Sequence, residues 1–235
     1  MSQRYQGAEL DLFSAAANWK AYFSTVLAPF IGARVLEVGA GLGGNIPYLC
    51  RNTVREWTSL EPDPDLARRI ADRKSSGALP AKCRVIAGTI AELDAAAQFD
   101  TILYIDVLEH IADDRTELAR AAEHLAPGGN LVVLAPAHQF LFSPFDTAVG
   151  HFRRYSRDTL IALAPPDCRL RNNLMLDSAG LLASLANRLL LRSDMPSPRQ
   201  IAFWDGVLVP VSRLLDAATG RMLGKSVVAV WSRVP

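Results

Sequence analysis

A short apolar strand that runs directly into glycines constrains the fold of this chain more than any other feature. The stretch Arg34–Asn45 reads RVLEVGAGLGGN, and its apolar start predicts a strand buried on both faces. Gly39, Gly41 and Gly43 allow a sharp turn and close approach to a ligand, and the helix that follows presents free N–H groups. A nucleotide-like ligand is therefore expected. Because Gly39, Gly41 and Gly44 also satisfy G-x-G-x-x-G, a dinucleotide-binding dehydrogenase stays open on this stretch alone.

Glu37 favours a different cofactor, because a carboxylate near the end of this strand suits a ligand with a cationic group, which NAD lacks. With Glu37 the run reads E-x-G-x-G-x-G, which resembles motif I of the class I S-adenosylmethionine-dependent methyltransferases. The resemblance implies S-adenosyl-L-methionine as cofactor and S-adenosyl-L-homocysteine as product. On this motif it assigns cofactor contacts to Glu37, Gly39, Ala40, Gly41, Gly43 and Asn45.

Length, charge and cysteine content narrow the class of protein. The 235 residues are enough for one domain with a substantial core, and we expect residues 1–235 to form one. Lys and Arg number 25 against 24 Asp and Glu, so nothing in the net charge of +1 favours nucleic acid as a partner. Cys50, Cys83 and Cys168 are widely spaced, which favours neither disulfides nor a zinc site. Without a signal peptide or a spanning stretch, a cytoplasmic protein is expected.

Alternating strand and helix patterns predict an α/β fold. Five strands separated by helices favour a parallel sheet with its ligand crevice at the carboxyl ends of the strands. A helix over 115–125 is expected to end at the glycines that follow Pro127. The methyltransferase resemblance implies a doubly wound, mostly parallel seven-stranded sheet with a final antiparallel strand. The strands are predicted at 34–38, 57–61, 83–87, 99–106, 130–136, 168–176 and 226–231.

The chain divides into an N-terminal helical lid (1–32), a cofactor-binding core (33–136), a substrate loop (137–157) and a helical insert (177–222). In the lid, Tyr5 and Trp19 are candidate substrate contacts, with plain surface positions as the alternative. The insert holds leucine-rich helical stretches at 179–191 and 201–217. It is interpreted as substrate cover, a dimer face, a membrane-surface element or ordinary core packing.

Acidic and apolar residues at the ends of the second and third strands are candidate contacts for the adenosine part of the cofactor. Glu61 ends its strand about 20 residues beyond the glycines, where a carboxylate reaches ribose hydroxyls. Pro62 and Asp63 follow it directly. Thr89 stands where the methyltransferase pattern often has an acidic residue for the adenine amino group, and Ile90 is a candidate wall of the adenine site. The alternatives are a solvated acid at 61 and a simple cap at 89.

The run Asp106-Val-Leu-Glu-His-Ile111 resembles the segment after strand four in the type 11 and type 12 methyltransferases. The resemblance implies that Asp106 and Val107 lie at the cofactor, where Asp106 orients the methionine moiety or the incoming acceptor. His110 is interpreted as a packed or hydrogen-bonded structural residue.

The segment after strand five is too long and too aromatic for a plain connection, and long loops at the active end of a sheet are often functional. Its Gly150-His-Phe-Arg-Arg-Tyr155 element resembles one in a bacterial subgroup of these methyltransferases. We expect His151 to act as general base, since imidazole titrates near neutral pH. Alternatively, His151 and the arginines tie the loop to carbonyls and to Asp146. The candidate substrate contacts in this segment are His138, Phe145, His151, Arg153, Arg154 and Tyr155.

The resemblance implies methyl transfer to an oxygen or nitrogen of a small-molecule acceptor such as a sugar, a natural product or a polar metabolite. One alternative is an acceptor that is a lipid or a lipid-linked saccharide at the membrane surface, reached by peripheral contact without stable insertion. Another is a non-catalytic S-adenosylmethionine-binding protein. No metal is required by the implied reaction, and no acidic ligand set is evident in the sequence. A monomer or a homodimer is expected.

Overall fold

The computed structural model describes residues 9–186 and 197–234, and they contain a seven-stranded sheet in the order β3-β2-β1-β4-β5-β7-β6. Strands β1 to β5 are parallel, whereas β7 runs antiparallel to both β5 and β6. The expected mostly parallel sheet with a final antiparallel strand is therefore confirmed. The strands are β1 (Arg34–Val38), β2 (Glu56–Glu61), β3 (Cys83–Ala87), β4 (Phe99–Ile105), β5 (Leu125–Pro136), β6 (Cys168–Leu176) and β7 (Ser226–Arg233).

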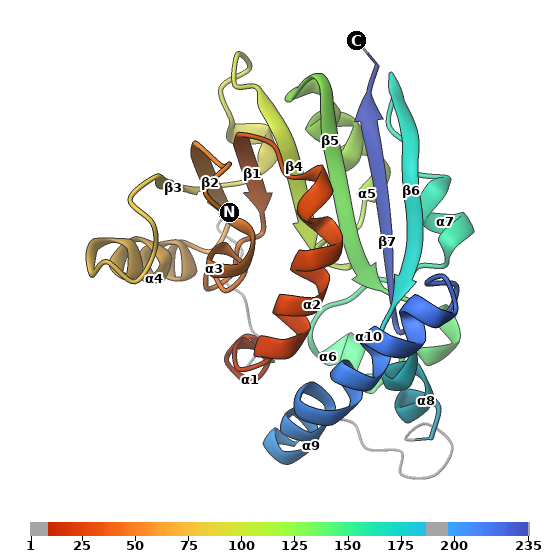
Figure 1. Cartoon of the computed structure of the whole chain (residues 1–235). Coiled ribbons are helices and arrows are strands. Elements are labelled where there is room, and N and C mark those ends of the chain that lie inside the picture. Colours follow the sequence, from red (N-terminus) through yellow and green to blue (C-terminus); the bar gives the residue numbers. More distant parts are fainter. Residues whose placement is uncertain (1–8, 187–196, 235) are drawn as a thin grey trace.

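Helices cover both faces of the sheet, with α2 (Ala17–Leu27) and α10 (Val209–Ala218) in front and α5 (Asp114–Glu123) and α7 (Arg157–Ile161) behind (Figure 1). Each face has its own apolar core. Val35 of β1 packs in the cluster that includes Phe23, whereas the next residue, Leu36, packs in the cluster that includes Leu118. Successive strand residues point to opposite faces, so the apolar run of β1 is explained by burial on both sides.

The connection from α5 to β5 differs from the sequence-based expectation. The helix ends at Glu123, and Leu125 already pairs with Phe99 of β4. Pro127, Gly128 and Gly129 therefore lie within β5, next to the register shift between the two strands, and do not form the end of the helix. Gly128 has a φ of 75°, a conformation that glycine adopts without steric cost.

The insert is joined to the N-terminal helices by buried carboxylates. The Asp205 side chain accepts the backbone N–H groups of Asn18 and Trp19 at 3.1 and 2.8 Å, which caps α2 from a distant part of the chain. Asp216 accepts the hydroxyl of Tyr22 at 2.8 Å. These contacts fix the first helices and the insert on the same end of the molecule.

The predicted helix over 201–217 is divided into α9 (Pro198–Phe203), a π-helical segment (Trp204–Leu208) and α10. Residues 179–186 belong to α8 (Ser178–Ala186), and the rest of the predicted 179–191 stretch lies outside the described residues. Among the described helices, none is long and apolar enough to cross a membrane. The remaining helices are α1 (Glu9–Ser14), α3 (Ile46–Leu49), α4 (Pro64–Ser75) and α6 (Pro144–Ala148).

Candidate functional site

A cavity of about 1480 Å³ opens at the carboxyl ends of the parallel strands. Its walls come from the glycine loop, the segment after β4, the 137–157 loop, the first two helices and the insert. This volume exceeds that of a typical single-ligand pocket, so the cavity has room for more than one small molecule. Of the predicted site residues, those that line it are Trp19, Gly39, Ala40, Gly41, Asn45, Asp106, Phe145, His151 and Arg154.

The glycine loop requires residues without a side chain. Gly39 has a φ of 66°, and a Cβ there would lie 2.7 Å from a methyl group of Val107. Gly41 has a φ of 56°, so both residues occupy the left-handed region that favours glycine. Gly43 does not line the cavity, because it packs against Ile46 and Ile70. Because Gly39 packs closely against Val107, the Val107 side chain supports the glycine loop from behind.

Glu61 holds the glycine loop in place through the backbone. Its carboxylate accepts the N–H of Gly41 at 2.7 Å and the N–H of Asp63 at 2.9 Å. Burial raises the pKa of Glu61, and these two hydrogen bonds oppose the shift. Asp63 caps α4 by accepting the N–H groups of Asp65 and Leu66. Glu61, Pro62 and Asp63 lie beside the cavity and do not line it.

Glu37 lies behind the glycine loop, although we expected it to face a cationic group of a ligand. It is only 1% exposed and does not line the cavity. Its Oε1 accepts the side-chain N–H of Asn45 at 2.9 Å, whereas Oε2 has no hydrogen-bond partner within the described part of the chain. Burial raises the pKa of Glu37 to about 7, and the neighbouring Asn45 and Trp57 side chains oppose the increase. Asn45 is the member of this pair that reaches the cavity wall.

Thr89 and Ile90 also lie outside the cavity wall. The backbone N–H of Thr89 donates to Oε2 of Glu92 at 2.6 Å at the start of a short 3-10 helix. The Ile90 side chain is 2% exposed and belongs to the core behind the sheet. This arrangement corresponds to the alternative in which the two residues cap and anchor the segment.

Asp106 follows β4 directly and lines the cavity. Its backbone has a φ of 53°, and its N–H donates to the carbonyl of Leu134 at 2.8 Å. The side chain is open to the cavity, while protein atoms surround it on its other sides. This confinement raises the pKa of Asp106 to about 6, and the charges of His151 and Lys225 oppose the increase.

His151 is oriented by a buried carboxylate. Its Nδ1 lies 2.8 Å from Oδ1 of Asp146, which is fully buried. The same carboxylate accepts two hydrogen bonds from the guanidinium of Arg154, at 2.7 and 2.9 Å, and others from Ser143. Hydrogen bonds from His151 and Arg154 hold the pKa of Asp146 well below its usual range, although burial alone would raise it. The imidazole therefore has one nitrogen fixed and the other, Nε2, available on the cavity side.

Two residues of the segment after β4 surround Nε2 of His151. Oε1 of Glu109 lies 3.9 Å from it, and the ring of His110 meets the ring of His151 edge-on at 4.6 Å between centroids. Burial raises the pKa of Glu109 well above its usual range. Burial and the neighbouring His151 lower the pKa of His110 to about 4. The sequence interpretation gave Glu109 no role, although it lies within the D-V-L-E-H-I run.

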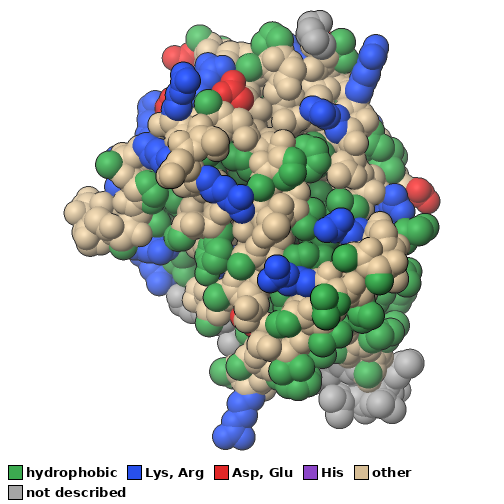
Figure 2. Space-filling view, viewed as in Figure 1, with side chains coloured by type: hydrophobic (Ala, Val, Ile, Leu, Met, Phe, Trp, Pro, Cys, Tyr) green, Lys and Arg blue, Asp and Glu red, His purple; other side chains and the backbone are tan. Residues whose placement is uncertain are grey.

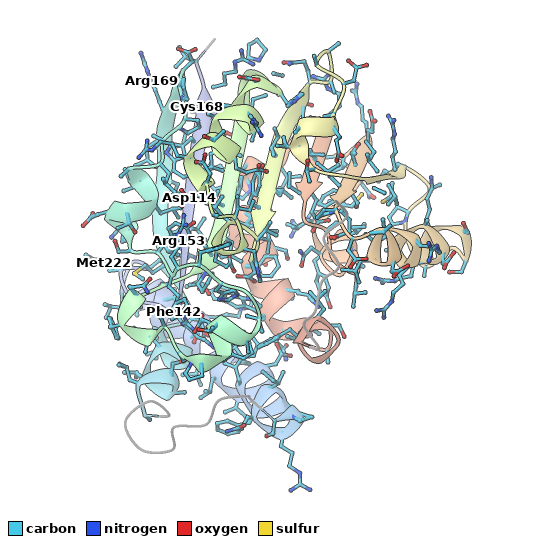
Figure 3. The ribbon with its side chains drawn as sticks, turned by 180° about the vertical axis from the view of Figure 1, so that it is seen from behind. Asp114, Phe142, Arg153, Cys168, Arg169 and Met222 are labelled. Atoms are coloured by element: carbon cyan, nitrogen blue, oxygen red, sulfur yellow. The ribbon has the colours of Figure 1, made fainter. Side chains whose placement is uncertain are left out.

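The other predicted substrate contacts of this loop do not line the cavity. Arg153 donates to Asp114 at 2.5 Å and to the carbonyl of Ala112 at 2.7 Å, on the side of the sheet shown in Figure 3. The buried hydroxyl of Tyr155 also donates to Asp114, at 2.8 Å. Nε2 of His138 lies 2.9 Å from the carbonyl of Gly224. These three side chains anchor the loop, and Tyr5 lies outside the described residues.

Two lysines of the cavity wall were missed by the sequence interpretation. Nζ of Lys20 donates to the carbonyls of Ser14 and Phe13 at 2.7 and 3.3 Å, and it lies 3.3 Å from where a Cβ on Gly44 would be. Burial lowers the pKa of Lys20, while Asp205 opposes the shift. Lys225 lies 5.3 Å from the ring centre of Trp204, and burial likewise lowers its pKa. Neither lysine belongs to a recognisable motif, so only the fold reveals them.

Comparisons with known proteins agree with this geometry. Residues 10–167 match a family model described as a methyltransferase domain. The ubiquinone biosynthesis O-methyltransferase of Xanthomonas axonopodis pv. citri is 28% identical over 148 residues, covering 55% of this chain and 61% of that protein. The demethylmenaquinone methyltransferase of Tropheryma whipplei strain Twist is 30% identical over 166 residues, covering 70% of this chain and 65% of that protein. The matches span somewhat over three fifths of these relatives.

Solved structures share the fold. The N-methyltransferase NodS from Bradyrhizobium japonicum WM9, in complex with S-adenosyl-L-homocysteine, aligns with a TM-score of 0.60 and 16% identity, covering 96% of this chain and 91% of that chain. The [4+2]-cyclase SpnF aligns with a TM-score of 0.65 and 14% identity, covering 97% of this chain and 94% of that chain. Because the second of these is described as a cyclase, the fold alone does not fix the reaction.

Proposed function

Since this chain belongs to the methyltransferase-domain family, we propose that it uses S-adenosyl-L-methionine to methylate an oxygen or nitrogen of a small-molecule acceptor. The observation that carries this proposal is the single cavity that joins the glycine loop to His151. One end has the backbone that a nucleoside cofactor needs, and the other has an oriented imidazole. Both ends converge on Asp106.

The residues at the first end fit S-adenosylmethionine. A Cβ at Gly39 would clash with Val107, and Gly41 presents bare backbone to the cavity. When bound, the cofactor supplies a methyl group on a cationic sulfur, which is already activated for transfer to a nucleophile. We assign the ribose hydroxyls to Glu61, which lies directly behind the glycine loop and outside the cavity wall, because a carboxylate retains acceptor capacity after its two backbone hydrogen bonds. The carboxylate of the cofactor's methionine part is assigned to Lys20, and its sulfonium region to Asp106.

At the other end we assign the proton acceptor to His151. Asp146 holds Nδ1 in one orientation, so Nε2 is presented to the cavity as the basic nitrogen. A general base of this kind typically contributes 10²–10⁴-fold when the acceptor is a hydroxyl. The rest of the rate enhancement comes from positioning the acceptor in line with the methyl group and excluding water.

The lining of the acceptor end supports a partly apolar acceptor. Phe13, Phe142, Phe145 and Trp204 contribute aromatic surface, and Lys225 contributes a cation. Aromatic side chains of this kind bind flat or apolar ligand surfaces, while a few polar groups fix the orientation. Within the small-molecule class, this composition favours a natural product with an aromatic or apolar skeleton over a free sugar.

The proposal is tested by transfer of a labelled methyl group to a panel of phenols, amines and sugar alcohols. We expect transfer to a hydroxylated apolar acceptor and heat of binding for S-adenosyl-L-homocysteine in a calorimeter. Binding of the cofactor product without transfer to any acceptor class would contradict the small-molecule proposal. Absence of binding to well-folded protein would contradict the cofactor assignments as well.

A lipid acceptor is the second candidate, because the insert exposes apolar side chains at the cavity end of the molecule. Hydrophobic side chains gather over α9 and α10 with basic side chains among them (Figure 2). Among the exposed ones, Leu214 is 76% accessible to solvent and Phe203, which also lines the cavity, is 57% accessible. Such a surface favours peripheral contact with a bilayer. Flotation with anionic vesicles, reduced by the double change Phe203→Ser and Leu214→Ser, would favour this candidate.

A further inference from the structure

Three side chains of the cavity wall form a cluster with the donor atoms of a metal site. Glu109 and His110 belong to the short 3-10 helix Leu108–His110. His151 lies in the 137–157 loop after β5, more than forty positions later in the sequence. One carboxylate oxygen and two imidazole nitrogens lie within 4.8 Å of one another. Small side-chain rotations would bring them to the spacing that a single ion requires.

An unpaired oxygen on one residue of the cluster is the second observation. Glu109 is 1% exposed, and its Oε2 has no hydrogen-bond partner in the part of the chain that the structure describes. Glu109 nevertheless lines the cavity. Burying a carboxylate oxygen without a partner is costly, and a cation at this place would remove that cost.

The outer contacts also suit metal binding. Asp146 accepts from Nδ1 of His151 at 2.8 Å, which leaves Nε2 as the donor to an ion. His110 hydrogen-bonds to the backbone of Gly150, which fixes its ring in the same way. A histidine ligand in metalloproteins usually has its second nitrogen bound to a carboxylate or a carbonyl. Both histidines of the cluster therefore have the support that ligands receive.

We propose that Glu109, His110 and His151 bind a divalent transition-metal ion inside the cavity, with Zn²⁺ as the best match. Two imidazoles and one carboxylate form a donor set typical of zinc sites that keep a fourth position open. Here the open position faces the cavity. The sequence gave no indication of such a site, because the third ligand joins the other two only in the folded chain.

The ion and the proton acceptor use the same nitrogen of His151. This consequence, unlike the binding itself, rests on the proposed function. An ion bound to Nε2 occupies the lone pair that would take the proton of the acceptor, so methyl transfer to a hydroxyl should fall as the site fills. The ion would thus inhibit base-assisted transfer.

The test is calorimetric titration of the folded full chain with Zn²⁺ alone, without cofactor or acceptor. We expect about one site per chain, and Glu109→Gln or His110→Gln should weaken binding at least tenfold, since loss of an outer-shell partner alone typically costs 10–100-fold. His138→Gln is the matched control, because its imidazole contacts the carbonyl of Gly224 outside the cluster. All proteins carry Cys50→Ser, because the thiols of Cys50 and Cys83 lie in contact and could compete for zinc.

Unchanged zinc affinity in both cluster variants, with circular dichroism confirming that they fold, would overturn the proposal. Co²⁺ titration gives an independent readout, because nitrogen and oxygen ligands produce weak visible bands without sulfur charge transfer. Zinc that binds at the cluster and yet stimulates transfer would overturn the inhibitory role. Since the titration contains no cofactor or acceptor, its failure leaves the methyltransferase proposal intact, and failure of methyl transfer leaves the titration result standing.

Discussion

The two ends of the cavity are built in different ways. At the cofactor end, the wall is mainly backbone in left-handed conformations that favour glycine, and Glu61 supports it by accepting backbone N–H groups. At the acceptor end, a loop is organised around one buried side chain, Asp146, which binds Ser143, His151 and Arg154. Loss of a single side chain should therefore weaken the cofactor end locally, whereas loss of Asp146 should release the whole acceptor end.

Asp146→Ala is the strongest test of this difference. It leaves the Arg154 cation buried without its partner, and breaking a buried ion pair in this way costs about 3–5 kcal/mol of unfolding free energy. Methyl transfer should fall at least as far as it does without His151, while the dissociation constant for S-adenosyl-L-homocysteine stays within about threefold. Denaturant unfolding and calorimetry measure the two effects. Equal losses at both ends of the cavity would refute the distinction drawn here.

His151→Ala should leave the acceptor loop folded and remove only its basic nitrogen. Turnover of a hydroxyl acceptor is expected to fall roughly 10²–10⁴-fold, with cofactor affinity nearly unchanged. His138→Ala, in the same loop but outside the cavity, serves as control. If turnover and cofactor affinity fall together in His151→Ala, this residue is structural and the proton acceptor lies elsewhere.

Glu37 differs from the rest of the cofactor end, where the backbone forms most of the structure, because its carboxyl side chain is buried and this burial costs stability when the group is ionised. Its folded pKa is about 7, above the unfolded value, so the unfolded chain loses its proton first and stability falls as the pH rises through this interval. Glu37→Gln removes this penalty. The unfolding free energy of the variant minus that of wild type should therefore increase by about 2–3 kcal/mol as the pH rises from 5 to 8.

Unfolding of both proteins across this pH range measures the difference directly. Subtracting the unfolding free energy of wild type at each pH removes the contribution of the other buried acids, which the two proteins share. A constant difference between the two proteins would show that Glu37 is ionised in the folded state at all of these pH values.

Glu61→Ala should weaken cofactor binding by about 1–3 kcal/mol, because the ribose hydroxyls lose a charged partner. Glu61→Gln is the milder variant, since its amide retains one acceptor for the N–H of Gly41 or Asp63. Calorimetry with S-adenosyl-L-homocysteine measures both. Full affinity in Glu61→Ala would leave this carboxylate with only its loop-supporting contacts.

The contrast between local backbone features and side chains with distant partners also explains what could be predicted from the sequence. The strand positions and the glycine loop follow from local patterns, because strand length, glycine spacing and apolar periodicity belong to consecutive residues. The antiparallel final strand was expected only from the methyltransferase resemblance. The start of β5 could not be predicted, because Leu125 continues the apolar face of α5 in sequence and pairs with Phe99 only in the sheet. Packing there overrides the local helical pattern.

At the site, residue type was more predictable than side-chain direction. The loop of His151 was found through its unusual composition, but neighbouring side chains in a loop diverge. Arg154 reaches Asp146 at the cavity wall, and Arg153 reaches Asp114 behind the sheet. Glu109 and Lys225 were missed because each acquires its role from partners far away in sequence. A local sequence pattern reflects the contacts within one helix or strand, and it does not show which distant residues a side chain will meet.

A substitution of Lys20 should have the smallest effect on cofactor affinity, and it tests the contrast most directly. Lys20 contributes a side chain to the cofactor end of the cavity, where the wall is mainly backbone. Two of its three ammonium hydrogens already meet the carbonyls of Ser14 and Phe13, so one donor remains for the cofactor's carboxylate. Lys20→Met keeps the apolar stem and removes the charge, and we expect cofactor affinity to fall by about 1 kcal/mol, or roughly fivefold. The loss should shrink at high salt, because a partly exposed charge pair is screened. A salt-independent loss would instead mean that Lys20 acts by holding α1 against α2, since its hydrogen bonds to the Phe13 and Ser14 carbonyls join these two helices.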